Sequence, residues 1–135
     1  MRISTKGRYG LKIILAIAKE KRGLTSAALS CTLDVSKVYL EQVLTLLRNA
    51  GIIISTRGSD GGYKLAKKEE AITIYEILLA AEPSVFEKTE GQNGVFDAEL
   101  HLSVFSPLDA AIENTLSKIT VSDALNAGGG AMFFI

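Results

Sequence analysis

The chain has 135 residues, of which 47% are hydrophobic and 22% charged, as expected for a single globular domain with its own core. No run approaches the ~20 apolar residues of a membrane-spanning helix, and the first residues lack the apolar segment of a secretory signal. The one cysteine, Cys31, excludes an internal disulfide and a four-cysteine zinc site. We therefore expect a cytoplasmic protein that does not contact membranes.

The formal net charge of zero hides an uneven distribution along the chain. Residues 1–68 hold 13 of the 15 Lys and Arg residues but 4 of the 15 acidic residues, so the first half carries +9 and the second half −9. Such a split predicts a first half that binds a polyanion and an acidic second half kept away from it. The alternative is that ordinary solvated faces happen to segregate.

Helical periodicity predicts three helices in the first fifty residues: residues 9–21, about 25–33 and about 37–50. The third has apolar residues at i, i+3, i+4 and i+7, which marks a buried face: Leu40, Val43, Leu44 and Leu47. Residues that suit the ends of the second and third helices stand in place: Thr25 or Ser26, Ser36 and Gly51. Two short helices joined by a tight turn are typical of a helix-turn-helix.

A β-hairpin is predicted after the third helix, with strands at residues 52–56 and 63–65 and with Gly61 and Gly62 supplying positive φ angles. A hairpin in this place predicts a winged helix, a mainly α fold with a small β-hairpin. The loop is not a phosphate-binding P-loop, because a strand follows its glycines. Arg57 at the base of this ribbon is placed to enter a DNA minor groove, and a plain solvent-exposed hairpin is the alternative.

The second half begins with a helix that a capping box opens at Thr73 and that ends before Pro83. Residues 84–105 are expected to be irregular, and Ser106 and Pro107 to begin a long helix. Its apolar residues form one narrow seam: Leu108, Ile112, Leu116 and Ile119. The seam needs a partner, which is either the same helix of a second subunit or the chain's own domain.

One further helical turn is expected at residues 121–125, after which Gly128, Gly129 and Gly130 uncouple the apolar end of the chain. This pattern divides the chain into four parts. They are a winged helix-turn-helix DNA-binding domain (residues 1–83), an irregular sensing or linker segment (84–106), a dimerisation helix region (107–127) and a flexible tail (128–135).

A resemblance to a known family rests on three stretches: MRISTKGRYGLKIILAIA (residues 1–18), VSKVYLEQVLTLLRNAGII (35–53) and STRGSDGGYKLAK (55–67). With these motifs the chain resembles the Rrf-two family of bacterial winged-helix transcription regulators, from residue 1 to about residue 81 and more loosely over the long C-terminal helix. The resemblance implies a homodimer joined near residues 107–119. It also implies a recognition helix in the major groove and a wing in the minor groove.

The resemblance further implies the DNA contacts. On the recognition helix and the wing they are Val38, Tyr39, Glu41, Gln42 and Arg57, with Ser36, Lys37 and Ser59 beside them; the expected ligands of backbone phosphates are Ser4, Lys6 and Arg8. The chemistry agrees, because glutamine pairs with adenine and glutamate accepts from cytosine N4, which makes Gln42 and Glu41 candidate base readers. For Glu41, a pairing with Lys37 one turn away is the alternative.

Family members that hold an iron–sulfur cluster carry three cysteines about six residues apart before the long helix. In this chain Gly94, Leu100 and Ser106 stand at that spacing, and residues 84–135 contain no cysteine, so thiolate ligation there is impossible. The chain thus resembles the cluster-free branch, which includes a repressor of cysteine metabolism, and we expect no cofactor. A lone histidine, His101, makes no metal site.

Sensing of an effector would then use other chemistry. Cys31 is expected to be partly exposed, as either an oxidisable thiol or an inert small residue. An apolar set before the long helix could line a pocket for a small-molecule or protein effector, or pack under the dimer helix: Val95, Phe96, Leu100, Leu102, Val104 and Phe105.

We therefore predict a homodimeric transcription regulator that binds double-stranded DNA sequence-specifically and acts as a repressor on a palindromic operator. The alternative is a winged-helix protein-interaction module that acts through its acidic C-terminal half. An enzyme is disfavoured, because the chain has one histidine, one cysteine and no recognisable nucleophile motif or phosphate loop.

Overall fold

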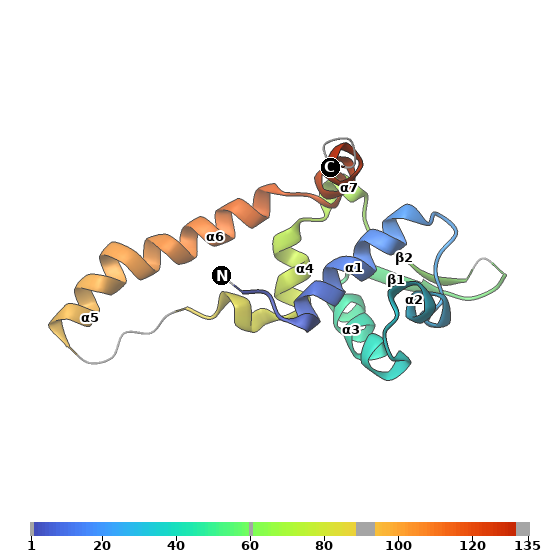
Figure 1. Cartoon of the computed structure of the whole chain (residues 1–135), viewed down its shortest axis with the longest axis horizontal. Coiled ribbons are helices and arrows are strands. Elements are labelled where there is room, and N and C mark those ends of the chain that lie inside the picture. Colours follow the sequence, from blue (N-terminus) through green and yellow to red (C-terminus); the bar gives the residue numbers. More distant parts are fainter. Residues whose placement is uncertain (1, 60, 89–93, 132–135) are drawn as a thin grey trace.

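Helix α1 (Thr5–Lys19) forms the centre of the N-terminal domain in the computed structural model (Figure 1). Its apolar face packs against α3 (Lys37–Asn49) and α4 (Ile74–Ala81). Most of the core consists of aliphatic side chains from these three helices: Ile13, Ile14, Ile17, Leu40, Val43, Leu44, Leu47, Ile77 and Leu78. The structure describes residues 2–59, 61–88 and 94–131.

Helices α2 (Ser26–Leu33) and α3 form the predicted helix-turn-helix. The side chains of Thr25 and Ser36 accept hydrogen bonds from backbone N–H groups in the first turns of α2 and α3, at 3.1 and 3.3 Å. Asp34 (φ 53°) makes the left-handed turn between the helices, and Gly51 (φ 76°) follows the end of α3. The predicted caps and the buried face of α3 are confirmed.

Helix α1 begins at Thr5, earlier than the predicted start at residue 9. Glycine costs a helix about 1 kcal/mol relative to alanine, but Gly7 and Gly10 are both buried where α1 crosses α4. A Cβ on Gly10 would lie 2.7 Å from the Cβ of Ala81. The two glycines therefore let the helices approach closely, and the packing they permit offsets their poor helix propensity.

Strands β1 (Ile53–Thr56) and β2 (Gly62–Leu65) pair antiparallel and form the predicted wing. The positive φ angles in the hairpin belong to Gly58 (105°) and Gly62 (125°), so the prediction for Gly61 was wrong. Gly61 is needed for space instead: its N–H donates to the carbonyl of Gly58 (2.9 Å), and a Cβ would lie 2.8 Å from that oxygen.

The wing is fastened to the loop between α1 and α2. Leu24 and Tyr63 exchange two backbone hydrogen bonds, of 3.1 and 2.7 Å. Gly62 lies against the same loop, where a Cβ would be 2.6 Å from the carbonyl carbon of Leu24. The start of β2 therefore holds a fixed position relative to the helix-turn-helix.

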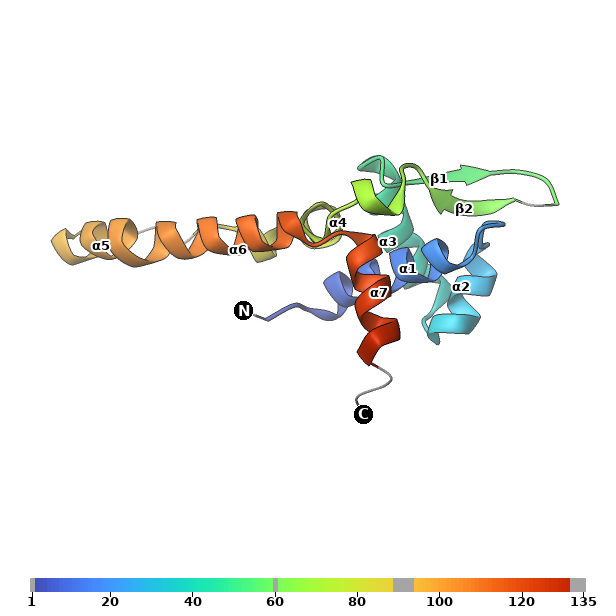
Figure 2. The same ribbon diagram turned by 90° about the horizontal axis from the view of Figure 1, so that it is seen from above.

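A long helical rod projects from this domain (Figures 1 and 2). It consists of α5 (Val95–Leu100), a π-helical turn (His101–Phe105) and α6 (Ser106–Lys118). The prediction that residues 84–105 are irregular was therefore wrong from residue 95 onward, and Ser106 and Pro107 lie inside a helix rather than at its start. Proline lacks an N–H and its ring crowds the preceding turn of an α-helix; here the wide π turn directly before it relieves that conflict.

Helix α7 (Val121–Ala131) returns the chain to the N-terminal domain (Figure 2). Val121 is fully buried and Leu125 packs against the core. The predictions of a single turn and of an uncoupling glycine triplet were wrong, because Gly128–Gly130 continue the helix. Residues 132–135 of the predicted tail lie outside the described residues. No described helix has both the length and the apolar character needed to cross a membrane.

Backbone hydrogen bonds tie the base of the rod to the start of α4. The N–H of Ile74 donates to the carbonyl of Ile119 (2.8 Å), and the N–H of Val121 donates to that of Ile72 (2.9 Å). The segment between α6 and α7 is therefore hydrogen-bonded to the backbone on both sides of Thr73, which fixes the end of the rod on the domain.

Replacing Gly10 with valine is expected to lower the free energy of unfolding by about 1–3 kcal/mol, because the new side chain would overlap Ala81. Denaturant titration measures this loss. The matched control is Arg8→Val on the exposed side of α1, which changes mainly helix propensity and should cost about 0.7 kcal/mol or less. Equal losses for the two variants would contradict the close contact between α1 and α4.

Replacing Gly62 with alanine is expected to loosen the contact between β2 and the loop that precedes α2. The left-handed φ and the overlap with Leu24 should together cost about 1–3 kcal/mol. Hydrogen exchange of the Tyr63 and Leu24 amides should then accelerate relative to core amides of α1. Gly51→Ala serves as the control, since it has a positive φ in open space, and it should leave the relative exchange at Tyr63 unchanged.

Candidate nucleic-acid interface

The first two turns of α3 present a polar surface to solvent. Lys37, Glu41 and Gln42 are exposed, and Val38 is 74% exposed although it is apolar. Tyr39 is half-buried, and Ser36 is exposed beside it. Every residue predicted on the recognition helix thus lies at one end of one helix, and the subunit itself does not cover this end.

Glu41 is not paired with Lys37 in the described part of the chain, where the ion pair present is that of Lys67 with Glu76 (2.9 Å). Its carboxylate Oε1 instead accepts a hydrogen bond from the hydroxyl of Ser26 on α2 (3.4 Å). The side chain of Glu41 therefore leans toward the start of α2, across the turn of the helix-turn-helix.

The predicted phosphate ligands lie at the start of α1. Ser4 and Arg8 are exposed and Lys6 is partly exposed. The hydroxyl of Ser4 does not cap α1, although its backbone N–H donates to a carboxylate oxygen of Glu82 (3.2 Å). These groups are therefore accessible to an anion.

An aromatic pair joins the start of α1 to the recognition helix. The rings of Tyr9 and Tyr39 meet edge to face, with centroids 5.5 Å apart, and the ammonium group of Lys12 lies 5.6 Å from the Tyr9 ring centroid. The contact between the two rings therefore helps to fix the start of α1, which carries the predicted phosphate ligands, relative to α3.

The wing carries Arg57 and Ser59 at exposed positions just beyond the end of β1. Arg57 thus lies in the loop of the hairpin, and the prediction that it lies at the base was wrong. Figure 1 shows α3 below α1, with the hairpin extending to the right beyond α2. The wing and the exposed end of α3 are thus separate projections from one rigid domain, as the predicted reading of two DNA grooves requires.

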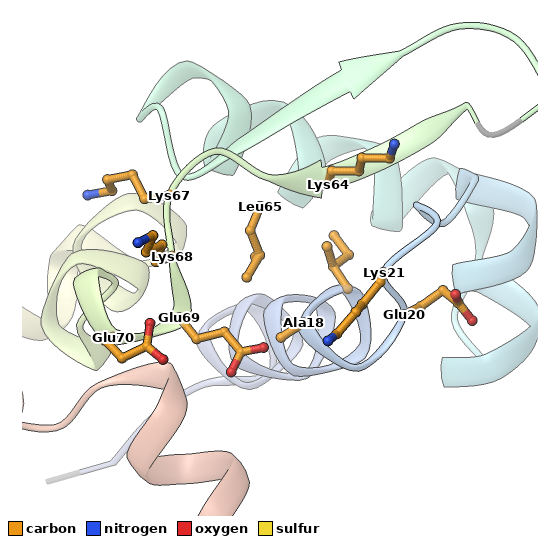
Figure 3. Close-up of a pocket in the computed structure, with 10 residues that line it drawn as sticks. Ala18, Glu20, Lys21, Lys64, Leu65, Lys67, Lys68, Glu69 and Glu70 are labelled. Carbon is orange, nitrogen blue, oxygen red and sulfur yellow. The ribbon is translucent and has the colours of Figure 1, made fainter.

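Part of the positive charge lies away from the recognition helix, at the root of the wing. A hollow with a volume of about 480 Å³ lies there. Its floor includes Ala18 and Leu65, and its rim is of mixed charge (Figure 3). The rim residues are Glu20, Lys21, Lys64, Lys67, Lys68, Glu69 and Glu70. Carboxylates therefore accompany these lysines, which belong to the positively charged first half of the chain.

The rod bears the predicted apolar seam. Leu108 is 54% exposed, Ile119 is exposed at the end of the rod, and Ile112 and Leu116 are half-buried. The inner part of α6 packs on α4, where Tyr75 contacts Phe86 with ring centroids 4.8 Å apart. Burial there and the neighbouring carboxylate of Glu113 on α6 raise the pKa of Tyr75 above its usual value.

The residues predicted to line an effector pocket lie on the rod itself. All but Phe105 are exposed: Val95, Phe96, Leu100, Leu102 and Val104. Within the described part of one subunit they therefore neither enclose a pocket nor pack under the helix. The prediction assumed an irregular segment folded beneath a separate helix, whereas the segment continues that helix. Cys31 is exposed on α2, as expected.

The donor atoms of this chain do not fit an iron–sulfur cluster at the family position. Gly94, Leu100 and Ser106 place no thiolate along the first half of the rod. Among the described residues, no three His, Cys, Asp or Glu side chains are grouped so as to hold a metal ion. The Nδ1 atom of His101 is buried without a hydrogen-bond partner in that part of the chain, but it stands alone.

Sequence reasoning missed three residues that shape this surface: Tyr9, Leu24 and Ser26. The first stands in the quoted motif at the start of the chain, which was the available signal. Leu24 pairs with a strand distant in sequence and left no local pattern. Ser26 was considered as a cap, and its contact with α3 depends on the tertiary arrangement of the two helices.

The sequence matches the Rrf2 family, described as iron-dependent transcriptional regulator, over residues 3–127. It is 46% identical over 84 residues to the HTH-type transcriptional regulator CymR of Bacillus subtilis, a match that covers 61% of each protein. It is 32% identical over 131 residues to the HTH-type transcriptional regulator IscR of Erwinia tasmaniensis, covering 93% of this chain and 79% of that protein. The match to CymR thus spans less than two thirds of the relative's length.

Solved structures agree over the whole architecture. CymR (YrzC), the global cysteine regulator of B. subtilis, superposes with a TM-score of 0.79 at 32% identity, covering 94% of this chain and 98% of that one. T. potens IscR superposes with a TM-score of 0.78 at 29% identity, covering 97% and 90%. Both similarities include the rod as well as the winged helix. The chain belongs to the Rrf2 family of transcriptional regulators.

Proposed function

We propose that the protein is a homodimeric winged-helix regulator, not an enzyme, that binds a palindromic operator in double-stranded DNA and represses transcription from it. The observation that carries this proposal is the exposed polar end of α3 beside a firmly based wing bearing Arg57, all within the half of the chain that carries +9. The relatives CymR and IscR, both named HTH-type transcriptional regulators, support it.

The exposed end of α3 offers three different readers of base edges in a major groove. Gln42 suits adenine, whose N6 and N7 atoms match the side-chain amide, and Glu41 suits the N4 amino group of cytosine. Val38 is apolar and 74% exposed, which suits contact with the C5-methyl group of thymine. A contact with thymine would explain why an apolar side chain is exposed at this position.

The remaining predicted residues fit a supporting role on the sugar–phosphate backbone. Ser4, Lys6 and Arg8 at the start of α1, and Ser36 and Lys37 at the start of α3, are exposed or partly exposed donors. Such contacts set the register of the protein on the duplex without reading its sequence. Arg57 and Ser59 on the wing would enter the neighbouring minor groove, where a narrow A·T-rich stretch attracts a cation.

The rod suits pairing with a second copy of the chain. It projects from the domain (Figure 1). Five of its apolar side chains are exposed in one subunit: Phe96, Leu100, Leu102, Val104 and Leu108. A two-fold axis through paired rods would place the two winged helices symmetrically, which matches a palindromic site. In this arrangement residues 1–83 read DNA, the rod joins the subunits, and α7 braces the rod against the domain.

Selection from a random DNA pool is expected to yield a palindrome bound with a Kd of about 10 nM or tighter at physiological salt, with affinity falling steeply as salt rises. Arg57→Ala should weaken binding to that site by about 1–3 kcal/mol and flatten any A·T preference beneath the wing. Fluorescence anisotropy on the selected site and its A·T-to-G·C variants measures both effects. Uniform weakening on every sequence would reduce Arg57 to a phosphate contact, and failure to select any sequence would contradict the proposed function.

Leu108→Glu is expected to break the dimer, because the change places a charge in the exposed part of the seam. Analytical ultracentrifugation should then give a monomer, and affinity for the palindrome should fall about tenfold or more while the melting temperature of the domain is retained. The matched control is Asn114→Glu, which adds the same charge to α6 away from the seam. A dimer that survives Leu108→Glu would argue against pairing through the rod.

A further inference from the structure

Glu41 is an unusual group for a surface that faces phosphates, since its charge is repelled by them. A glutamate there aids binding only if its carboxylate meets a base amino group in a defined orientation. A freely rotating exposed glutamate would lose side-chain entropy on binding and could turn toward a phosphate instead. What holds Glu41 in place therefore decides whether it reads a base.

Ser26 on the neighbouring helix α2 restrains the side chain of Glu41 through a hydrogen bond. Its hydroxyl donates to Oε1 of Glu41 (3.4 Å), and among the described residues Oε2 accepts no hydrogen bond. Both ends of this contact stand on fixed backbone: the cap at Thr25 sets the start of α2, and the cap at Ser36 sets the start of α3. The hydroxyl of Thr45 also donates to the carbonyl of Glu41 (2.8 Å).

The same segment is joined to the wing. Leu24, two residues before Ser26, shares two backbone hydrogen bonds with Tyr63, and Gly62 packs against the backbone of Leu24 and Thr25. The hydroxyl that contacts Glu41 thus belongs to the first residue of α2, directly after a loop that the hairpin also contacts. A carboxylate oriented from this residue has a set position relative to both reading elements.

We propose that Ser26 is a positioning residue for base reading: its hydroxyl holds one carboxylate oxygen of Glu41 so that the other can accept from the N4 amino group of cytosine. This inference rests on the proposed function, because it assigns a role within DNA recognition. It makes Ser26 a determinant of sequence specificity that acts through Glu41, without contacting a base.

The test compares Ser26→Ala, Ser26→Thr and Glu41→Gln with the double variant Ser26→Ala/Glu41→Gln. Affinities are measured on the selected operator, on each of its single base-pair variants and on unrelated DNA. Thr32→Ala, which removes an exposed hydroxyl from the same helix, is the matched control. Circular dichroism melting checks that each variant is folded.

Ser26→Ala is expected to weaken operator binding by about three- to tenfold and to reduce discrimination at the base pair where Glu41→Gln also reduces it. Binding to unrelated DNA and the salt dependence should stay unchanged, Ser26→Thr should retain wild-type discrimination, and Ser26→Ala should add nothing in the Glu41→Gln background.

Three results would overturn the inference: equal weakening on all sequences, which indicates a phosphate contact by Ser26; independent, additive effects of the two single variants; or behaviour no different from Thr32→Ala. Failure of the proposed function would look different, because the wild-type protein itself would then discriminate between no sequences.

Discussion

Burial of one face of α3 is the constraint on which the candidate site depends. Leu40, Val43, Leu44 and Leu47 are at most 1% exposed, and they pack against α1, α2 and α4. Because an α-helix repeats about every 3.6 residues, fixing this face turns the intervening side chains outward. The polar surface at the start of α3 is thus formed by folding of the core, and no side chain has to be uncovered before it can meet a ligand.

The charge split of the sequence has a partial counterpart in the structure. Acidic residues dominate the rod, which projects away from the winged helix, so like-charge repulsion keeps the rod from lying along a polyanion. The lysines at the root of the wing are interleaved with Glu20, Glu69 and Glu70, and Lys67 is paired with Glu76. Their presence raises the charge count of the first half without adding to the field at α3.

Local signals predicted the helix-turn-helix, its caps, the wing and the seam of the rod, because each is encoded within a few turns of chain. The errors at the two ends of the chain share a cause in contacts between distant segments. Gly7 lies against Leu78 and Glu82, Gly10 lies against Ala81, and α7 continues through three glycines after Val121 is buried in the core. The candidate site followed the same rule: residues on α3 and the wing could be named from motifs, whereas Ser26 emerged only once α2 and α3 were seen side by side.

The π turn at His101–Phe105 has a consequence for the phase of the rod. Successive residues of an α-helix advance by about 100°, so Phe96 and Leu100 would lie well to one side of Leu108, Ile112 and Leu116 in an uninterrupted helix. A π turn acts as a one-residue insertion and sets the phase back by about that angle. The two apolar stretches are thereby brought into one continuous stripe. Here the irregular geometry restores alignment, and a regular helix of the same sequence would present two stripes facing different directions.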